Sequence, residues 1–145
     1  MNILFVCTGN TCRSAMAAAL FNKIAVERDL DVRIESAGIF ANDGEPASNE
    51  AIIAMKKYDI DLLGHHAQSI NTELIEKSDL ILVMTAAHKM VLEAAAKDKV
   101  FTLSEYAGFD GDIEDPYGGD ISEYEKCAEK LYLVLEKVAD KLGNS

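Results

Sequence analysis

The alternation of short apolar runs with helix-like segments is the feature of this sequence that most restricts its fold. Asn2 to Val6 is rich in strand formers, and Asp79 to Met84 is a continuous apolar run of the kind seen in strands buried on both faces. A weaker strand pattern covers Val32 to Glu35, before an expected turn at Ser36-Ala37-Gly38, and a short one covers Val100 to Leu103.

Helical periodicity fills the intervals between these runs. We expect helices over residues 12–28, 47–58, 73–77, 86–97 and 121–142, with Asn71 capping the third. Strands that alternate with helices form right-handed crossover units, in which helices cover both sides of a parallel sheet. The pattern predicts an α/β fold with four strands and a single domain spanning residues 1–145. The longest loop is expected at 105–120, and long loops in compact domains are often functional.

Composition narrows the class of partner. A formal net charge of -11 argues against nucleic acid and against anionic membrane surfaces, since both need a basic footprint. No stretch approaches the roughly 20 apolar residues of a transmembrane helix, and the N-terminus does not resemble a secretory signal. Three cysteines without metal-ligand spacing fit a reducing compartment, so we expect a cytoplasmic protein.

The segment from Cys7 to Ser14 lies between the first strand and the first helix, where an open parallel sheet binds its ligands. A helix N-terminus there attracts a phosphate dianion, and the loop amides can point inward around it. Gly9 and Asn10 are best able to adopt the left-handed conformations that such a loop requires. The predicted phosphate-binding residues are Thr8, Gly9, Asn10, Thr11, Cys12, Arg13 and Ser14.

The same surroundings suit Cys7 to act as a nucleophile. A helix N-terminus and a guanidinium would hold its thiol as the thiolate at neutral pH, and a thiolate can attack phosphorus to form a phosphocysteine. Arg13 would grip two phosphate oxygens with its planar fork, and Ser14 would donate a hydrogen bond to the departing thiolate. The expected chemistry needs no metal and no other cofactor, because Arg13 and backbone amides supply the positive charge.

Both cysteines of the loop also have a simpler interpretation. A lone cysteine at a strand end is usually a small buried hydrophobe, but the full pattern around Cys7 favours catalysis. Cys12 has two interpretations that the sequence leaves open. It either packs in the first helical turn or forms a disulfide with oxidised Cys7, which would protect Cys7 from further oxidation.

Asp115 in the long loop is the candidate for protonating a leaving group. Pro116 restricts Asp115 to an extended backbone, which gives its side chain a defined direction, and Tyr117 would form a wall of the cleft. Taken alone, an Asp-Pro pair is more often a turn opener.

Together these motifs resemble the low-molecular-weight protein tyrosine phosphatase family and, within it, the bacterial protein-arginine-phosphatase branch. The resemblance covers essentially the whole chain and rests on CTGNTCRS at 7–14, SAG at 36–38, His65 ahead of Ala67-Gln68, and DPYGG at 115–119. It implies a three-layer sandwich whose parallel sheet has the strand order 2-1-3-4. It also implies that Cys7 is the nucleophile, Arg13 the phosphate clamp, and Asp115 the acid and later the base that activates water.

The likeness further implies a hydrogen-bond network that holds the loop, formed by Asn10, Ser14, Ser36 and His65. Without it, His65 and His66 would be taken as ordinary surface histidines. Family members commonly have Pro and Glu where this chain has Ala15 and Ala18. That departure concerns the start of the first helix and its surface contacts, outside the phosphate cradle.

Thr11 bears on which phosphorylated side chain is the substrate, because it lies in the loop at the expected pocket rim. Phosphotyrosine branches usually have a larger aliphatic residue there, whereas threonine with the DPYGG segment resembles the arginine branch. A guanidinium is narrower and more polar than a phenyl ring, so a small hydroxyl-bearing rim suits it. We expect phosphorylated proteins as substrates, phosphoarginine ahead of phosphotyrosine, and inorganic phosphate as product.

Two other classes of protein could use such a loop. Thiol-dependent arsenate reductases resemble this fold but need further cysteines to relay a disulfide, and only Cys127 remains, on the last helix. A non-catalytic phosphate-binding or phosphocarrier module would need no acid such as Asp115, so the Asp-Pro loop counts against it.

Overall fold

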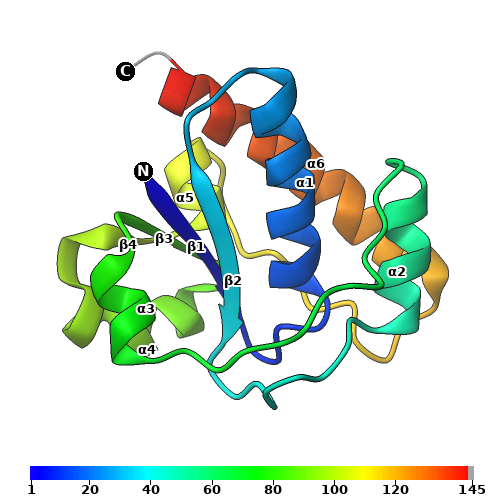
Figure 1. Cartoon of the computed structure of the whole chain (residues 1–145), viewed down its shortest axis with the longest axis horizontal. Helices are drawn as coiled ribbons and strands as arrows, with labels where there is room; N and C mark the ends of the chain where they lie inside the picture. Colours follow the sequence, from blue (N-terminus) through cyan, green and yellow to red (C-terminus); the bar gives the residue numbers. More distant parts are fainter. Residues whose placement is uncertain (144–145) are drawn as a thin grey trace.

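A four-stranded parallel sheet forms the centre of the computed structural model, which describes residues 1–143 (Figure 1). The order is β2-β1-β3-β4, formed by β1 (Asn2–Cys7), β2 (Arg33–Gly38), β3 (Leu80–Val83) and β4 (Val100–Thr102). The predicted fold class and strand order are therefore confirmed. Because β1 is central and parallel to both neighbours, its last residue, Cys7, lies at the edge where the carboxyl ends of all strands meet.

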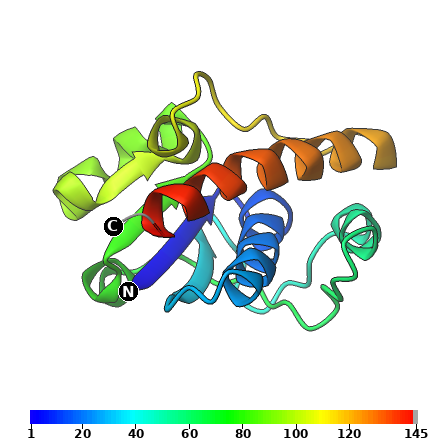
Figure 2. The same ribbon diagram turned by 90° about the horizontal axis from the view of Figure 1, so that it is seen from above.

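Helices cover both faces of the sheet (Figures 1 and 2). On one face lie α1 (Arg13–Glu27), α2 (Asn49–Lys56), α5 (Leu103–Ala107) and α6 (Ile121–Gly143). The other face carries α3 (Thr72–Lys77) and α4 (Ala86–Ala96), which a short 3-10 helix, η1 (Lys97–Lys99), connects to β4. No helix among residues 1–143 is both long and apolar enough to cross a membrane.

Alternation along β1 explains how one strand supports two apolar cores. Ile3 and Phe5 pack toward α1 and α6, whereas Leu4 and Val6 pack toward α3 and α4. All four are at most 1% exposed. The strand that carries Cys7 is therefore fixed from both sides, and this places the cysteine at a defined point of the sheet edge.

Two local expectations were wrong. Ser36-Ala37-Gly38 does not form a turn but continues β2, because it stays in parallel register with Phe5 to Cys7. The expected loop at 105–120 begins later, since residues 103–107 form helix α5. A capping box explains this helix: the Thr102 hydroxyl accepts from the Glu105 amide, and the Glu105 carboxylate accepts from the Thr102 amide.

Candidate active site

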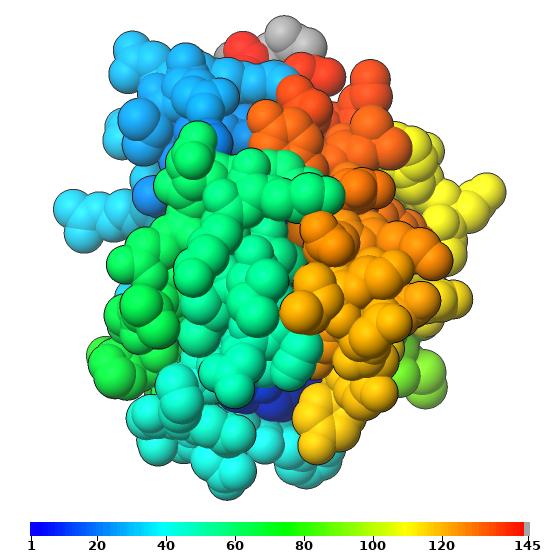
Figure 3. All heavy atoms as spheres, turned by 90° about the vertical axis from the view of Figure 1, so that its right-hand side faces the viewer, coloured from blue at the N-terminus to red at the C-terminus, as the bar shows by residue number. Residues whose placement is uncertain are grey.

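A cavity of about 280 Å³ opens at the carboxyl edge of the sheet. Its walls come from the loop after β1, the segment after β2 and the loop before α6, namely Cys7, Thr8, Gly9, Thr11, Cys12, Arg13, Phe40, Asn42, Glu45, Asp115 and Tyr117. Figure 3 shows the dark-blue β1–α1 segment at the bottom of a hollow, between the cyan segment after β2 and the gold segment before α6. The structure therefore brings the predicted nucleophile, clamp and acid into one cavity.

Two backbone amides and one hydroxyl surround the sulfur of Cys7, and this residue is 1% exposed. The backbone amides of Asn10 and Ser14 lie 3.3 and 3.4 Å from Sγ, and the Ser14 hydroxyl lies 2.9 Å from it. Amides and a hydroxyl directed at one sulfur stabilise negative charge on it. The three groups therefore converge on the sulfur atom that the predicted nucleophilic attack would use.

The predicted network around Asn10 is present. The Asn10 side-chain amide donates to the hydroxyls of Ser14 (2.8 Å) and Ser36 (2.9 Å), and the Asn10 backbone carbonyl oxygen lies 2.6 Å from Nε2 of His65. The sequence did not reveal that the Asn10 side-chain oxygen also accepts from the Gln68 amide at 3.0 Å. Asn10 is fully buried, so these bonds hold the loop against both β2 and the 65–68 segment.

The backbone conformation of the loop shows that the expectation for Gly9 was wrong, and its packing shows why residue 38 is a glycine. Asn10 has a positive φ of 58°, but Gly9 is not left-handed. Gly38 is the glycine that the loop requires, because a Cβ there would lie 2.6 Å from the Thr8 carbonyl oxygen and 2.9 Å from the Asn10 nitrogen. The end of β2 thus needs glycine to let the loop pass closely.

Arg13 is the first residue of α1, and it is 4% exposed. One terminal nitrogen donates to the Ile113 carbonyl at 3.0 Å, and the other lies 3.5 Å from an Asp115 carboxylate oxygen. Nε is buried and has no partner within residues 1–143. A buried guanidinium with an unused donor is suited to binding an oxyanion.

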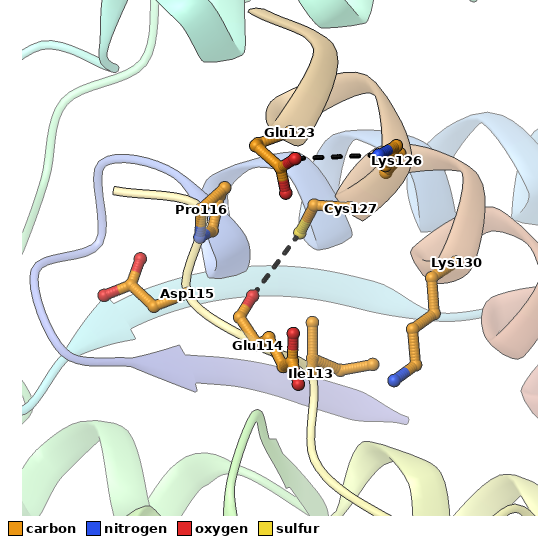
Figure 4. A pocket seen from close by; sticks show the side chains of 8 residues that line it. All are labelled: Ile113, Glu114, Asp115, Pro116, Glu123, Lys126, Cys127 and Lys130. Atoms are coloured by element: carbon orange, nitrogen blue, oxygen red, sulfur yellow. Dashed lines mark hydrogen bonds and ion pairs between the residues drawn. The ribbon is translucent and has the colours of Figure 1, made fainter. Parts of the chain in front are cut away.

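Asp115 lies at the mouth of the cavity with a side chain that is 46% exposed. Its carboxylate accepts a hydrogen bond from the Tyr117 amide at 3.0 Å. This bond closes a turn around Pro116 and fixes the direction of the Asp115 side chain. Figure 4 shows a second, smaller cavity behind this loop, lined in part by Cys127 and Lys130, and the Asp115 side chain points away from Cys127. Although Asp115 borders both cavities, its carboxylate contacts Arg13 and Cys12 of the phosphate loop.

The two remaining cysteines are buried and free. Burial, together with the charges of Cys7 and Asp115, raises the pKa of the Cys12 thiol to about 12, and burial raises the pKa of Cys127 to about 12 as well. Cys12 Sγ lies 3.8 Å from Asp115, and Cys127 Sγ lies 3.9 Å from the Glu114 carbonyl. Cys127, near the start of α6, therefore packs back against the loop that carries Asp115.

Four residues of the cavity or its support were missed by the sequence reasoning. Phe40, Asn42 and Glu45 line the cavity, and the Phe40 residue is 79% exposed. His88, at the start of α4, lies 2.9 Å from the Thr8 hydroxyl. The one signal in the sequence that could have indicated them is their position after predicted parallel strands. The segments after β2 and β3 begin at the same edge of the sheet as Cys7.

The chain matches the model of the family described as low molecular weight phosphotyrosine protein phosphatase over residues 2–145. It is 43% identical to a protein-arginine-phosphatase of Bacillus subtilis, with 98% of this chain and 97% of the relative covered. It is also 36% identical to the low molecular weight protein-tyrosine-phosphatase PtpB of Staphylococcus epidermidis, covering 97% of this chain and 99% of that protein.

Solved structures give the same result. A YwlE arginine phosphatase mutant with a phosphorylated active-site serine superposes with a TM-score of 0.95 at 42% identity, over 99% of this chain and 96% of the other. The chain belongs to the low molecular weight phosphotyrosine protein phosphatase family.

Proposed function

We propose that this member of a protein phosphatase family hydrolyses phosphoarginine in proteins through a phosphocysteine on Cys7, without a metal ion. The observation that carries the proposal is the composition of one cavity. It combines Cys7 and Arg13 at the floor with Thr11 and the carboxylates of Glu45 and Asp115 at the wall.

In the first step, the Cys7 thiolate attacks phosphorus and the bond from phosphorus to the substrate nitrogen breaks. The buried Arg13 binds the equatorial phosphoryl oxygens, using the Nε donor that has no protein partner. The leaving nitrogen keeps the electron pair of the broken bond and takes a proton from Asp115, so arginine departs as the guanidinium cation. The product of this step is phosphocysteine.

In the second step, Asp115 acts as the base. It takes a proton from a water molecule, which attacks the phosphocysteine, and the sulfur–phosphorus bond breaks to release inorganic phosphate. The departing thiolate returns to the donors of Asn10 and Ser14, which already lie within 3.4 Å of the sulfur. The ring of donors therefore stabilises the same charge at the start and at the end of the cycle.

The acidic rim supports phosphoarginine as the substrate. Among the described residues that line the cavity, Arg13 is the one cationic side chain, and it is bound to the floor. Asp115 and Glu45, which also line the cavity, place two carboxylates near the group that carries the phosphate, and this suits a guanidinium better than a phenyl ring. A protein-arginine-phosphatase is also among the relatives of this chain.

Phosphotyrosine is the second candidate, because two rings stand at the rim. Phe40 and Tyr117 are 79% and 80% exposed and line the same cavity. Such rings can stack on a phenyl group, although they also attract a guanidinium through cation–π contact. The relative from Staphylococcus epidermidis that is named a protein-tyrosine-phosphatase also supports this second candidate.

Initial hydrolysis rates on a phosphoarginine peptide and a phosphotyrosine peptide of matched sequence, measured without metal, test the proposal. Wild type should prefer phosphoarginine, Cys7→Ser should be inactive on both, and Thr11→Ile should shift the preference toward phosphotyrosine. Thr72→Ile is the matched control, since Thr72 is exposed at the start of α3, away from the cavity.

The outcomes separate mechanism from specificity. A wild type that prefers phosphotyrosine would overturn the arginine assignment and leave the cysteine chemistry intact. Activity that persists in Cys7→Ser would overturn the mechanism itself. We place this reaction in the cytoplasm, where the three free thiols are kept reduced.

A further inference from the structure

His88 is a buried histidine that the chemistry above does not use. It lies in the first turn of α4, is 8% exposed, and donates its backbone amide to the Thr85 cap at 3.2 Å. Its Nε2 lies 2.9 Å from the hydroxyl of Thr8, the residue that follows Cys7. The ring therefore joins α4 directly to the phosphate loop.

The other ring nitrogen argues against a merely structural role. Nδ1 of His88 is buried and has no hydrogen-bond partner within residues 1–143. A buried unsatisfied polar atom costs stability, so an apolar side chain would fill this position better if packing were its purpose. An apolar side chain could not form the hydrogen bond that Nε2 of His88 makes with the Thr8 hydroxyl.

Thr8 is held from two opposite sides. On one side its carbonyl oxygen accepts from the Phe40 amide at 2.9 Å, after β2. On the other side its hydroxyl bonds to His88 on α4. Asn10, two residues later, is held by His65, so each half of the loop has one histidine against it.

We propose that His88 is a positioning residue that acts through Thr8, fixing the first residue of the phosphate loop so that its amide is preorganised for the phosphoryl oxygens. Burial, and then the charge of Arg13, lowers the pKa of His88, so the ring is neutral at physiological pH. The nearby carboxylates of Asp112 and Asp115 oppose this shift. The inference rests on the proposed phosphatase function.

The test is competitive inhibition by inorganic phosphate, which reports anion binding by the loop, together with KM and kcat on an aryl phosphate and the melting temperature. His88→Phe should raise the phosphate inhibition constant about tenfold, because a loosened loop misplaces its donors, while the melting temperature holds or rises. His88→Gln should restore most of the affinity, since its amide can reach Thr8. Thr8→Val should match His88→Phe, and the double variant should be no worse than either single one.

His66→Gln is the control, because the His66 side chain is exposed. An unchanged phosphate inhibition constant in a folded His88→Phe protein would overturn the inference. So would additive effects in the double variant or a failure of His88→Gln to recover. An inactive wild type, or an active Cys7→Ser, would instead defeat the proposed function, so the two failures are distinguishable.

Discussion

The hydroxyl of Ser14 lies 2.9 Å from the sulfur of Cys7, and a third residue, Asn10, donates to the same hydroxyl oxygen. Asn10 donates its side-chain amide to Ser14 Oγ at 2.8 Å, which occupies a lone pair of that oxygen. The Ser14 proton then has two acceptors within reach, the sulfur at 2.9 Å and the Ala37 carbonyl at 3.4 Å, and the shorter contact favours the sulfur. A hydrogen bond of this polarity stabilises the thiolate that leaves when phosphocysteine is hydrolysed.

Ser14→Ala should therefore slow the second step more than the first. A hydrogen bond to a charged group contributes about 1.5–3 kcal/mol, so kcat should fall about 10- to 100-fold. Rapid-mixing kinetics with an aryl phosphate should show a burst of the aryl alcohol close to one equivalent of enzyme, followed by slow turnover. A uniform slowing without a burst would contradict the assigned polarity.

Asp115→Asn should remove the proton donor and retain the shape of the side chain. We expect kcat to fall about 10²- to 10⁴-fold, and the loss should be larger for substrates whose leaving group is more basic. Rates across a series of aryl phosphates measure this dependence. Glu114→Gln is the matched control, since its side chain is exposed in the same loop, and it should leave the series unchanged. A loss that does not depend on the leaving group would exclude Asp115 as the acid.

The sequence predicted the order of elements well, because strand and helix periodicities are local properties. It also placed Cys7 and Arg13 around one loop, since five intervening residues and a following helix leave little choice of geometry. Their catalytic roles, and that of Asp115, remain predictions that the variants above test.

What the sequence could not predict depends on contacts between distant segments. Gly38 was predicted to be a turn residue. Its lack of a Cβ instead allows the phosphate loop to lie against the backbone at the end of β2. His88 carries no motif, and its contact with Thr8 exists only because β1 and β3 are adjacent in the sheet.

Gly38→Ala should disturb activity through the phosphate loop. Its new Cβ would lie 2.6 Å from a backbone oxygen of Thr8, so the loop and β2 must separate. We expect weaker inhibition by phosphate and a destabilisation of about 1–3 kcal/mol. Gly64→Ala is the control, because a Cβ there meets nothing within 4 Å. Denaturant unfolding and phosphate inhibition, measured side by side, should separate the two variants, and equal behaviour would contradict the close approach.

Cys127 should make the folded state sensitive to alkali. Its pKa rises from 9.0 to about 12 in the fold, so above pH 9.0 the unfolded chain loses the thiol proton while the folded chain keeps it. Stability is therefore fully present below the unfolded value and is lost as pH rises from 9.0 toward 12. Denaturant midpoints at about pH 8 and about pH 10.5 measure this loss, which should be smaller in Cys127→Ala than in wild type. Parallel losses in the two proteins would contradict the raised pKa.

Glu45 tests the acidic rim as a source of substrate preference. Exposed Glu45 lines the cavity, and its carboxylate is held by one bond of 3.3 Å from Asn42, so it can turn toward a bound guanidinium. An exposed ion pair is worth about 0.2–1 kcal/mol, so Glu45→Gln should lower kcat/KM for a phosphoarginine peptide about 1.5- to 5-fold and leave a phosphotyrosine peptide unchanged. The effect should shrink as salt is added, because the pair is solvent-exposed. Glu93→Gln, which removes the same charge from the exposed face of α4, controls for the change in net charge. Equal losses on both peptides, or the same loss in Glu93→Gln, would show that the rim carboxylate does not distinguish the two substrates.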